Sequence, residues 1–366
     1  MKITKIALNG FRNYDFDTAE FGAGTNVIYG ANAQGKTNLL EAVYMLSCGR
    51  SFRTRFDREL IGFGCDSADI LADIVSRDRE QTVRILMRQG VRKQITVNGV
   101  KKTASELSGT VNAVLFCPDD LNLIKEGAAA RRRLLDNAIC QIRPRYAEFL
   151  TEFNRYYENK TRILKDWREK TSLLDTLDEF SDGMCRLSAQ LIRYRAAFAK
   201  RLNEEAAPIH SEFSGAGERL EIEYSTVSTV KDPLGAVKEI YYDLCDHQES
   251  HRKAELDSQQ CLTGAHKDDL IISINGKNAR SFASQGQTRT AALSLKLAER
   301  EIFLDETGEY PILLLDDVLS ELDPKRQEFV LNRIGGGQTL ITCCEDEGIS
   351  RRTGGKVLHV DKGRIR

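Results

Sequence analysis

A glycine-rich segment near one end of the chain has the composition of a phosphate-binding loop. It reads Gly30-Ala31-Asn32-Ala33-Gln34-Gly35-Lys36-Thr37 and matches the pattern G-x-x-x-x-G-K-[ST] in full. Glycines let the backbone fold into a nest of inward-pointing N–H groups that bind phosphate oxygens. The Lys36 ammonium would contact the β- and γ-phosphates, and the Thr37 hydroxyl would ligate Mg²⁺. The segment therefore predicts a site for a nucleoside triphosphate and its magnesium ion.

The residues around this loop supply the strand and the helix that such a site needs. Val27-Ile28-Tyr29 is a short apolar run typical of a strand, and a helical pattern continues from Lys36 through Asn38 to Met45. The positive N-terminal end of that helix adds to the attraction for phosphate. A chance glycine-rich turn would lack this order of strand, loop and helix. We therefore expect Asn38 to line the nucleotide site together with the loop.

Two adjacent carboxylates follow an apolar run near the other end of the chain. Residues 312–315 are all apolar, which is typical of a parallel strand covered on both faces, and Asp316 and Asp317 come next. Asp316 can hold the magnesium ion through water, and Asp317 can orient or deprotonate an attacking water. A core strand with two solvated carboxylates at its tip is the alternative, and the loop makes it the weaker one. Lys36, Asp316 and Asp317 are the expected catalytic residues, with Thr37 and Asp316 on the metal.

Composition limits the classes of partner. The 366 residues carry 53 Lys+Arg and 54 Asp+Glu, a net charge of -1, so nucleic acid could be bound only through a local basic face. A membrane-spanning helix needs about 18 consecutive apolar residues, and the sequence contains no such run. The nine cysteines are scattered without a C-x-x-C pair, which favours a reducing, cytoplasmic compartment over a disulfide framework or a zinc site.

Strand and helix patterns place both chemical groups in one discontinuous lobe. The first 117 residues alternate strand and helix, with strands expected at 1–8, 26–29, 68–76, 81–88 and 93–97. Towards the other end, a helix over 288–304 leads to the strand at 312–315, and further strands are expected at 339–342 and 357–360, with a loose stretch at 351–356. The nucleotide-binding lobe is therefore expected to comprise residues 1–117 and 300–366.

The middle of the chain predicts a mainly helical lobe over residues 118–299. Apolar residues between 145 and 169 recur at helical spacing. Those at 184, 187, 191, 194 and 198 step by three and four, as in a short coiled-coil seam. Together they predict an antiparallel helical hairpin of modest length joined near 173–181. Strands at 270–274 and 277–282 are expected to flank a turn at Asn275-Gly276.

A second anion-binding motif precedes the paired carboxylates. Ala283-Ser284-Gln285-Gly286-Gln287 begins a helix, where a serine hydroxyl and backbone N–H groups can capture an anion. Ser284, Gly286 and Gln287 match the L-S-G-G-Q signature of ABC-type ATPases, whereas Ala283 and Gln285 depart from it. Ser320-Glu321-Leu322-Asp323 resembles the D-loop of the same superfamily, through Ser320 and Asp323. In ABC ATPases the signature meets the γ-phosphate on the opposite subunit, so the resemblance implies that residues 284–287 act in trans.

The ordered set of motifs resembles the RecF family of bacterial DNA replication and repair ATPases. The set comprises Phe11-Arg12-Asn13-Tyr14, the phosphate-binding loop, Phe116-Cys117-Pro118-Asp119-Asp120-Leu121, Arg131-Arg132-Arg133-Leu134-Leu135-Asp136, Thr263-Gly264-Ala265-His266-Lys267-Asp268-Asp269-Leu270 and the signature with Thr288-Arg289-Thr290. An Asp rather than a Glu at 317, and the lack of a switch His after residues 339–342, fit the same family. The lack of that His leaves Thr342 as a weak candidate for the γ-phosphate sensor.

The resemblance implies a fold, an activity and partners. The fold class is α/β, an ABC-type P-loop ATPase lobe built from both chain ends, with a mainly helical second lobe inserted. The activity is a weak, DNA-stimulated ATPase that uses ATP and Mg²⁺, forms an ATP-dependent homodimer and binds double-stranded and gapped DNA. The role is to help RecA load at single-strand gaps in recombinational repair and replication restart, with RecR and, through it, RecO as partners. Arg12 is a further implied nucleotide contact.

A locally basic segment is the candidate for DNA contact. Residues 128–170 carry eleven Lys or Arg against six Asp or Glu, a net charge of +5. The candidates are Arg131, Arg132, Arg133, Lys160, Arg162 and Lys165. Contacts of this kind neutralise phosphates and weaken with salt. The alternative is a solvated helix face with ion pairs between residues four apart.

Two other functions share the phosphate-binding loop. An ABC-type ATPase subunit of a membrane transporter would carry a clear Q-loop and a switch His, and the basic middle segment argues against it. A small-molecule P-loop kinase would leave Ser284 and its neighbours without a role.

The loop assignment makes a direct prediction. Replacing Lys36 with Met removes the ammonium from the phosphates, so ATP affinity should fall by at least tenfold, the equivalent of about 1.4 kcal/mol. Titration with a fluorescent ATP analogue measures this. Unchanged affinity in Lys36→Met would overturn the assignment of the phosphate-binding loop.

Overall fold

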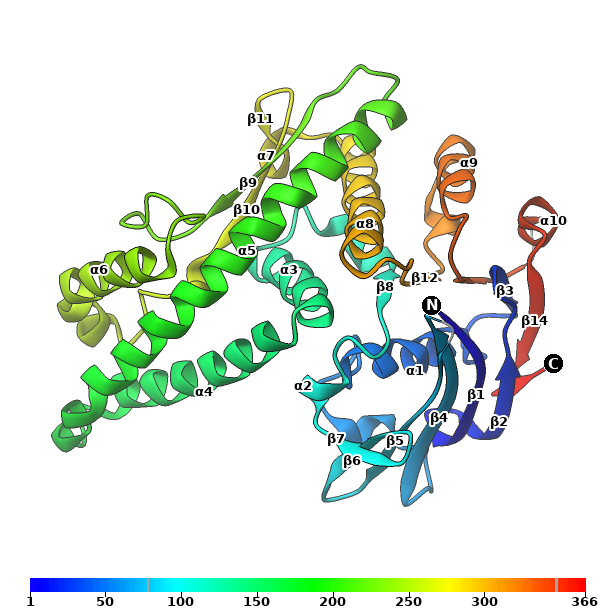
Figure 1. Ribbon diagram of the computed structural model, residues 1–366, viewed down its shortest axis with the longest axis horizontal. Coiled ribbons are helices and arrows are strands. Elements are labelled where there is room, and N and C mark those ends of the chain that lie inside the picture. Colours follow the sequence, from blue (N-terminus) through cyan, green and yellow to red (C-terminus); the bar gives the residue numbers. More distant parts are fainter. Residues whose placement is uncertain (78, 346–347) are drawn as a thin grey trace.

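The computed structural model describes residues 1–77, 79–345 and 348–366, and two sheets form its first lobe (Figure 1). One sheet is antiparallel, with strand order β2-β1-β4-β5-β6-β7. Its strands are β1 (Lys2–Phe11), β2 (Tyr14–Glu20), β4 (Ser67–Ser76), β5 (Arg79–Arg88), β6 (Val91–Val97) and β7 (Val100–Lys102). This meander contains more strand and less helix than the expected alternation, and β2 was not predicted.

The second sheet brings the two ends of the chain together. Its order is β15-β14-β3-β13-β12-β8, and the neighbours from β14 to β8 run parallel. The strands are β3 (Thr25–Tyr29), β8 (Ala113–Phe116), β12 (Ile312–Asp316), β13 (Thr339–Cys343), β14 (Lys356–Asp361) and β15 (Arg364–Ile365). The short helices of this lobe are η1 (Asp57–Leu60), α2 (Ala104–Leu107), η5 (Leu319–Glu321), α9 (Pro324–Arg333) and α10 (Ile349–Thr353).

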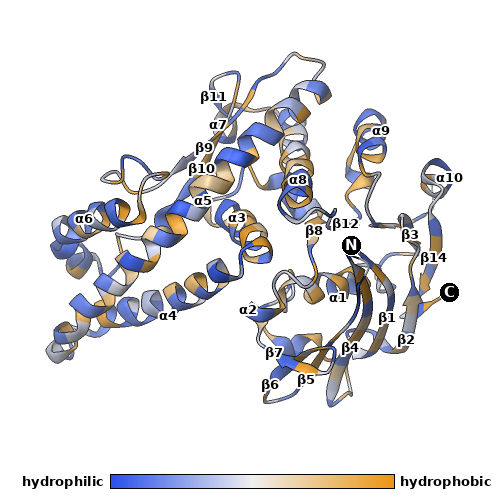
Figure 2. Cartoon of the chain, viewed as in Figure 1, coloured by the Kyte–Doolittle hydropathy of each residue, from blue (hydrophilic) through white to orange (hydrophobic). Residues whose placement is uncertain are grey.

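Alternate residues of the central strands serve two different cores. Ile28, Ile312 and Leu314 pack with α1 (Lys36–Cys48) and the antiparallel sheet. Leu313 and Leu315 point the other way, into the core shared with the second lobe. Figure 2 shows the hydrophobic colour along β8, the neighbour of β12 in this sheet, that burial on both faces requires. The apolar run at 312–315 is therefore a strand covered on both faces, as predicted.

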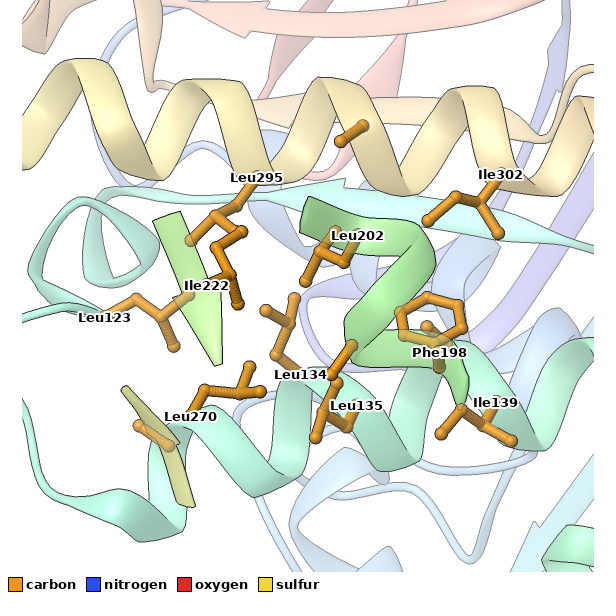
Figure 3. Packing of buried hydrophobic residues seen from close by; sticks show 14 of the residues in the cluster. Leu123, Leu134, Leu135, Ile139, Phe198, Leu202, Ile222, Leu270, Leu295 and Ile302 are labelled. Atoms are coloured by element: carbon orange, nitrogen blue, oxygen red, sulfur yellow. The ribbon is translucent and has the colours of Figure 1, made fainter. Parts of the chain in front are cut away.

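The second lobe packs long helices on a small sheet. Its helices are η2 (Pro118–Asn122), α3 (Ala128–Ile142), α4 (Pro144–Asp166), η3 (Thr171–Thr176), α5 (Leu177–Phe213), α6 (Val237–Ser258), η4 (Ala265–Lys267), α7 (Ala279–Phe282) and α8 (Gln285–Thr307). The sheet has the order β11-β10-β9, with β9 (Leu220–Ser225), β10 (Asp269–Ile274) and β11 (Lys277–Asn278). Figure 3 shows Leu134, Phe198, Ile222, Leu270 and Leu295 meeting in its core.

The predicted helical hairpin is present as α4 and α5, which lie side by side (Figure 1). The helices approach so closely that a Cβ atom at Gly183 would lie 2.2 Å from the Tyr156 ring. Only glycine fits there. At 37 residues, α5 extends well beyond the predicted seam on both sides.

Two expected elements are wrong. The second strand of the 277–282 segment stops at Asn278, because the Asn278 side chain accepts a hydrogen bond from the Arg280 backbone N–H and caps α7. The stretch expected to be loose at 351–356 instead contains part of α10 and the first residue of β14. The helix α8 also runs without a break through residue 300, where the boundary between lobes was expected.

A buried ion-pair network ties the second lobe together. Arg195 on α5 donates to Asp268 at 2.7 Å and to Asp136 on α3 at 2.9 Å. Burial raises the pKa of Asp268, and Arg195 together with a hydrogen bond from the Tyr224 hydroxyl offsets that effect. Because the pairs join α3 and α5 to the segment before β10, they fix the part of the lobe that leads to α8.

No helix in the described ranges combines the length and apolarity that crossing a bilayer demands.

Removing one partner from this network leaves buried charge without compensation. Arg195→Met should destabilise the protein by about 3–5 kcal/mol, because two carboxylates lose their cation. Chemical denaturation followed by circular dichroism measures the change. Arg162→Met is the matched control, since Arg162 is 82% exposed and its removal should leave stability unchanged within error. Equal stability of both variants would contradict the structural role of the network.

Candidate nucleotide-binding site

The phosphate-binding loop connects β3 to α1, as the sequence predicts. Gly30 passes so close to β14 that a Cβ atom would lie 2.1 Å from the Val360 carbonyl oxygen, so a larger residue would displace the loop. Gly35 is the N-cap of α1 and directs its first N–H groups at the loop. Ala31, Asn32 and Ala33 are exposed and can be reached by a ligand.

Lys36 lies inside the loop with its charge satisfied. Its ammonium donates to the carbonyl oxygens of Gly30 at 2.6 Å and Ala31 at 3.0 Å, and the residue is 7% exposed. A phosphate oxygen at the loop can take over these hydrogen bonds without a large movement of the side chain. The ammonium is therefore positioned for a triphosphate before one binds.

Neighbouring segments hold the loop in shape. The Asn13 side chain donates to the Gln34 carbonyl oxygen at 2.8 Å, and the Tyr14 hydroxyl donates to the Gly35 carbonyl oxygen at 3.0 Å. From the other side, the Lys362 backbone N–H donates to the Gln34 side chain at 2.6 Å. The sequence motif at 11–14 contained both Asn13 and Tyr14, but their contact with the loop was not predicted.

Arg12 pairs with the helix that follows the loop. Its guanidinium donates to both Glu41 carboxylate oxygens, at 2.9 and 2.7 Å, and to the Glu59 carbonyl oxygen at 2.8 Å. Glu41 is fully buried on α1, so the pair braces the helix behind the loop. Its guanidinium thus supports the site from α1, and its implied contact with a nucleotide stays a prediction.

The Thr37 hydroxyl and the Asp316 carboxylate meet, although they lie at opposite ends of the sequence. Thr37 donates to Asp316 Oδ1 at 2.9 Å, and Thr342 on β13 donates to the same oxygen at 2.9 Å. Burial raises the pKa of Asp316, which is 6% exposed, and the two hydroxyl hydrogen bonds counteract that rise. A hydroxyl and a carboxylate side by side are the hard oxygen ligands that Mg²⁺ prefers, so the residues fit the ion.

Asp317 is held in an unusual backbone conformation beside this pair. Its φ of 53° lies in the left-handed region, and its backbone N–H donates to the Thr342 hydroxyl at 2.8 Å. The Ser320 hydroxyl donates to the Asp317 carbonyl oxygen at 2.6 Å. A strained residue held from two sides at a strand end is a common feature of functional sites.

These contacts argue against Thr342 as the γ-phosphate sensor. Thr342 is 1% exposed and its hydroxyl lies between Asp316 and the Asp317 backbone. Its hydroxyl is therefore occupied in positioning Asp316 and Asp317.

Arg53 is a site residue that the motifs did not reveal. Its guanidinium donates to the Asn38 side-chain oxygen at 2.7 Å, and its charge lowers the pKa of Asp316. Both Arg53 and Asp316 line a cleft of about 890 Å³ between the lobes, together with Arg50, Arg55 and Arg132. The run of arginines at 50, 53 and 55 was the available signal.

The signature forms the start of α8 and faces outward. Ser284 is exposed and caps the helix, since its hydroxyl accepts the Gln287 backbone N–H at 3.2 Å. The Gln287 side chain accepts the Ser284 backbone N–H at 2.8 Å, which completes a capping box. The Ser284 hydroxyl acts as an acceptor here, so its own hydrogen can be directed at an anion.

The D-loop lies against the signature helix. Arg289 on α8 donates to the Glu321 carbonyl oxygen at 2.6 Å, and Arg326 on α9 donates to the Gly286 carbonyl oxygen at 3.2 Å. Asp323 caps α9 by accepting the Arg326 backbone N–H at 3.1 Å. The segment 320–326 thus links the strand that ends at Asp316 to the signature.

The basic segment is divided by burial. Arg131 is 3% exposed and bidentate to Asp269, at 2.7 and 2.9 Å, and Lys160 is fully buried against Glu255 at 2.7 Å. These two are structural cations, and their expected contact with DNA is wrong because a buried, paired charge cannot reach a phosphate. Arg132 donates to the Asp268 carbonyl oxygen at 2.6 Å. Arg133, Arg162 and Lys165 are exposed.

Comparison with known proteins gives one consistent result. The family model described as RecF/RecN/SMC N terminal domain matches residues 2–360. The DNA replication and repair protein RecF of Acetivibrio thermocellus is 40% identical over 361 residues, 98% of this chain and 98% of the relative. The RecF protein of Bacillus mycoides is 40% identical over 371 residues, 100% of this chain and 98% of the relative.

Solved structures agree with these relatives. The recombination mediator protein RecF of the RecFOR pathway, solved with ATPrS, has a TM-score of 0.92 at 35% identity and covers 100% of this chain and 97% of that chain. An Smc head domain from Pyrococcus furiosus is 17% identical with a TM-score of 0.57, covers 100% of this chain and 95% of that chain, and shows the fold alone. The predicted α/β class with an ABC-type ATPase head is confirmed.

The hydroxyl of Thr342 should govern the pH dependence of magnesium binding. Because burial already raises the pKa of Asp316, loss of one hydrogen bond to its carboxylate in Thr342→Val should raise that pKa further. Magnesium-dependent ATP affinity falls as the carboxylate is protonated, so the fall should begin at higher pH in the variant. Calorimetric titration across pH measures it, and Thr342→Ser, which keeps the hydroxyl, is the control. Coincident profiles for Val and Ser variants would refute the role of this hydrogen bond.

Proposed function

The chain belongs to the RecF family, and from that premise we propose that it is an ATP-gated, dimerising DNA-binding ATPase of replication and repair. Two copies would close over two ATP molecules, each lying between the phosphate-binding loop of one copy and the signature of the other. Closure would hold double-stranded or gapped DNA, and slow hydrolysis would release it.

The exposure of the signature is the observation that carries this proposal. Ser284 stands uncovered at the N-terminal end of α8, where backbone N–H groups and a hydroxyl can bind an anion. The hydroxyl and the backbone N–H of Ser284 bond to Gln287, and the Lys36 ammonium bonds to its own loop. Each half of the site is therefore complete within itself and open towards a ligand, as a shared triphosphate between two copies requires.

Each residue around the phosphate-binding loop would have a separate role in hydrolysis. Lys36 would bind the β- and γ-phosphate oxygens, and Thr37 and Asp316 would hold a magnesium ion, which lowers the charge of the transferring phosphoryl group. Asp317 would orient the attacking water and accept its proton. The backbone hydrogen bond to Thr342 and the contact from Ser320 keep Asp317 beside the metal ligand.

DNA would meet the exposed cations. Arg133, Arg162 and Lys165 lie on α3 and α4 and remain available to phosphates, so binding should weaken as salt rises. The related structure is of a RecF protein in the RecFOR pathway, which supports RecR and RecO as partners. With them, the protein would help RecA load at single-strand gaps. Family membership replaces the transporter and kinase interpretations, because neither belongs to the family that matches residues 2–360.

The oligomeric mass tests the proposal. The protein should sediment as a monomer with ADP and as a dimer with a non-hydrolysable ATP analogue. Asp317→Asn should bind ATP normally and remain dimeric with ATP itself, because turnover is blocked, and should retard a gapped duplex in a gel only when ATP is present. Glu158→Gln removes an exposed carboxylate from α4 and serves as the control. A wild-type protein that stays monomeric with every nucleotide would refute the ATP-gated dimer.

A further inference from the structure

Gln287 of the signature uses both ends of its side-chain amide. The amide oxygen accepts the Ser284 backbone N–H at 2.8 Å, and the amide nitrogen donates to Glu218 Oε1 at 2.8 Å. Glu218 belongs to the turn between α5 and β9, outside every motif recognised in the sequence. A residue of the second lobe thus contacts the signature directly.

The chemistry of Glu218 decides how that amide is oriented. An ionised carboxylate accepts hydrogen bonds and cannot donate them, so the NH₂ group of Gln287 must face Glu218. The oxygen then faces the Ser284 N–H. If the amide were flipped, its NH₂ group would oppose the N–H of Ser284, donor against donor, and the capping box would be lost.

Glu218 is itself held from behind. Its Oε2 lies 3.1 Å from His210 Nε2, and His210 is fully buried on α5. Burial lowers the pKa of His210, which favours the neutral ring, and a hydrogen on Nε2 would then be donated to the carboxylate. The Glu218 backbone N–H also donates to the Ser214 hydroxyl at 3.3 Å.

His210 also contacts α8, the helix that begins with the signature. His210 Nδ1 lies 3.4 Å from the Ser294 hydroxyl on α8, and the hydrogen of that hydroxyl can go to this unprotonated nitrogen or to the Thr290 carbonyl oxygen at 2.9 Å. Ser294, His210, Glu218 and Gln287 therefore form a chain that leaves α8, crosses α5 and rejoins α8 at its first turn. The signature turn is fixed by the second lobe as well as by its own sequence.

We propose that Glu218 is a positioning residue for the composite nucleotide site. It orients the Gln287 amide, keeps the capping box closed and leaves the Ser284 hydroxyl hydrogen pointing out of the helix towards the γ-phosphate on a second copy. This role rests on the proposed function for its consequence, but the orientation of Gln287 is a property of the single chain.

Two substitutions separate positioning from mere packing. Glu218→Ala removes the acceptor and frees the amide to flip. Glu218→Gln keeps an oxygen for Gln287, and His210 can adopt its other tautomer to accept from the new NH₂ group. The glutamine variant should therefore retain the wild-type behaviour, which an effect of charge alone would not allow.

The first measurement needs no nucleotide. Hydrogen–deuterium exchange of a peptide covering residues 282–290 should be about fivefold to tenfold faster in Glu218→Ala than in wild type, the loss expected for a helix N-cap. Glu218→Gln should exchange at the wild-type rate. Equal exchange in Glu218→Ala and wild type would overturn the inference, whatever the protein does with ATP.

The second measurement follows dimerisation with the non-hydrolysable ATP analogue. Glu218→Ala should weaken the dimer about tenfold while the monomer binds a fluorescent ATP analogue normally, because the phosphate-binding loop is untouched. In a Gln287→Ala background the Glu218→Ala change should have no further effect, since both act through one hydrogen bond. A full additional loss in that background would show that Glu218 acts elsewhere and would contradict the inference. If wild type and Glu218→Gln both fail to dimerise, the proposed function fails, and the exchange result still decides the role of Glu218.

Discussion

The nearly complete burial of the Asp316 carboxylate is the constraint on which the first lobe depends. Burial disfavours the charged form, and hydroxyls from Thr37 and Thr342 compensate through hydrogen bonds of 2.9 Å. These hydroxyls come from the start of α1 and from β13, so the contact exists only when β3, β12 and β13 pair in register. The parallel sheet and the two residues proposed to hold magnesium, Thr37 and Asp316, are therefore one structural unit.

The second half-site depends on a different set of forces. The signature turn is held by a capping box, by Glu218 from the second lobe and by Arg326 from α9. Its neighbours thus come from both lobes, whereas the phosphate-binding loop is held within the first lobe alone. A movement between the lobes would change the presentation of Ser284 without disturbing Lys36, which suits the proposed closing of two copies over ATP.

Local sequence patterns predicted the elements whose buried positions recur at the spacing of a strand or a helix. The apolar run before Asp316 is a doubly buried strand, and the helical hairpin has the predicted partners. The prediction of a strand over 277–282 was wrong because a single capping residue, Asn278, outweighs the strand propensity of the residues around it. The prediction of DNA contact was wrong for part of the basic segment, because a basic residue on a helix gives the same sequence signal whether it faces solvent or a buried carboxylate. Arg131 and Lys160 meet Asp269 and Glu255 only after the lobe has folded.

The sequence by itself determined the chemistry of both half-sites, because each motif carries its function in residue types at short spacing: the loop with Lys36 and Thr37, the pair Asp316 and Asp317, and the cap at Ser284. Only the tertiary structure decided which side chains support them. Asn13, Arg53, Thr342 and Glu218 come from separate segments, and their roles depend on distances that no local pattern encodes. The physical reason is that a hydrogen bond acts over about 3 Å in space, regardless of how many residues separate its partners along the chain.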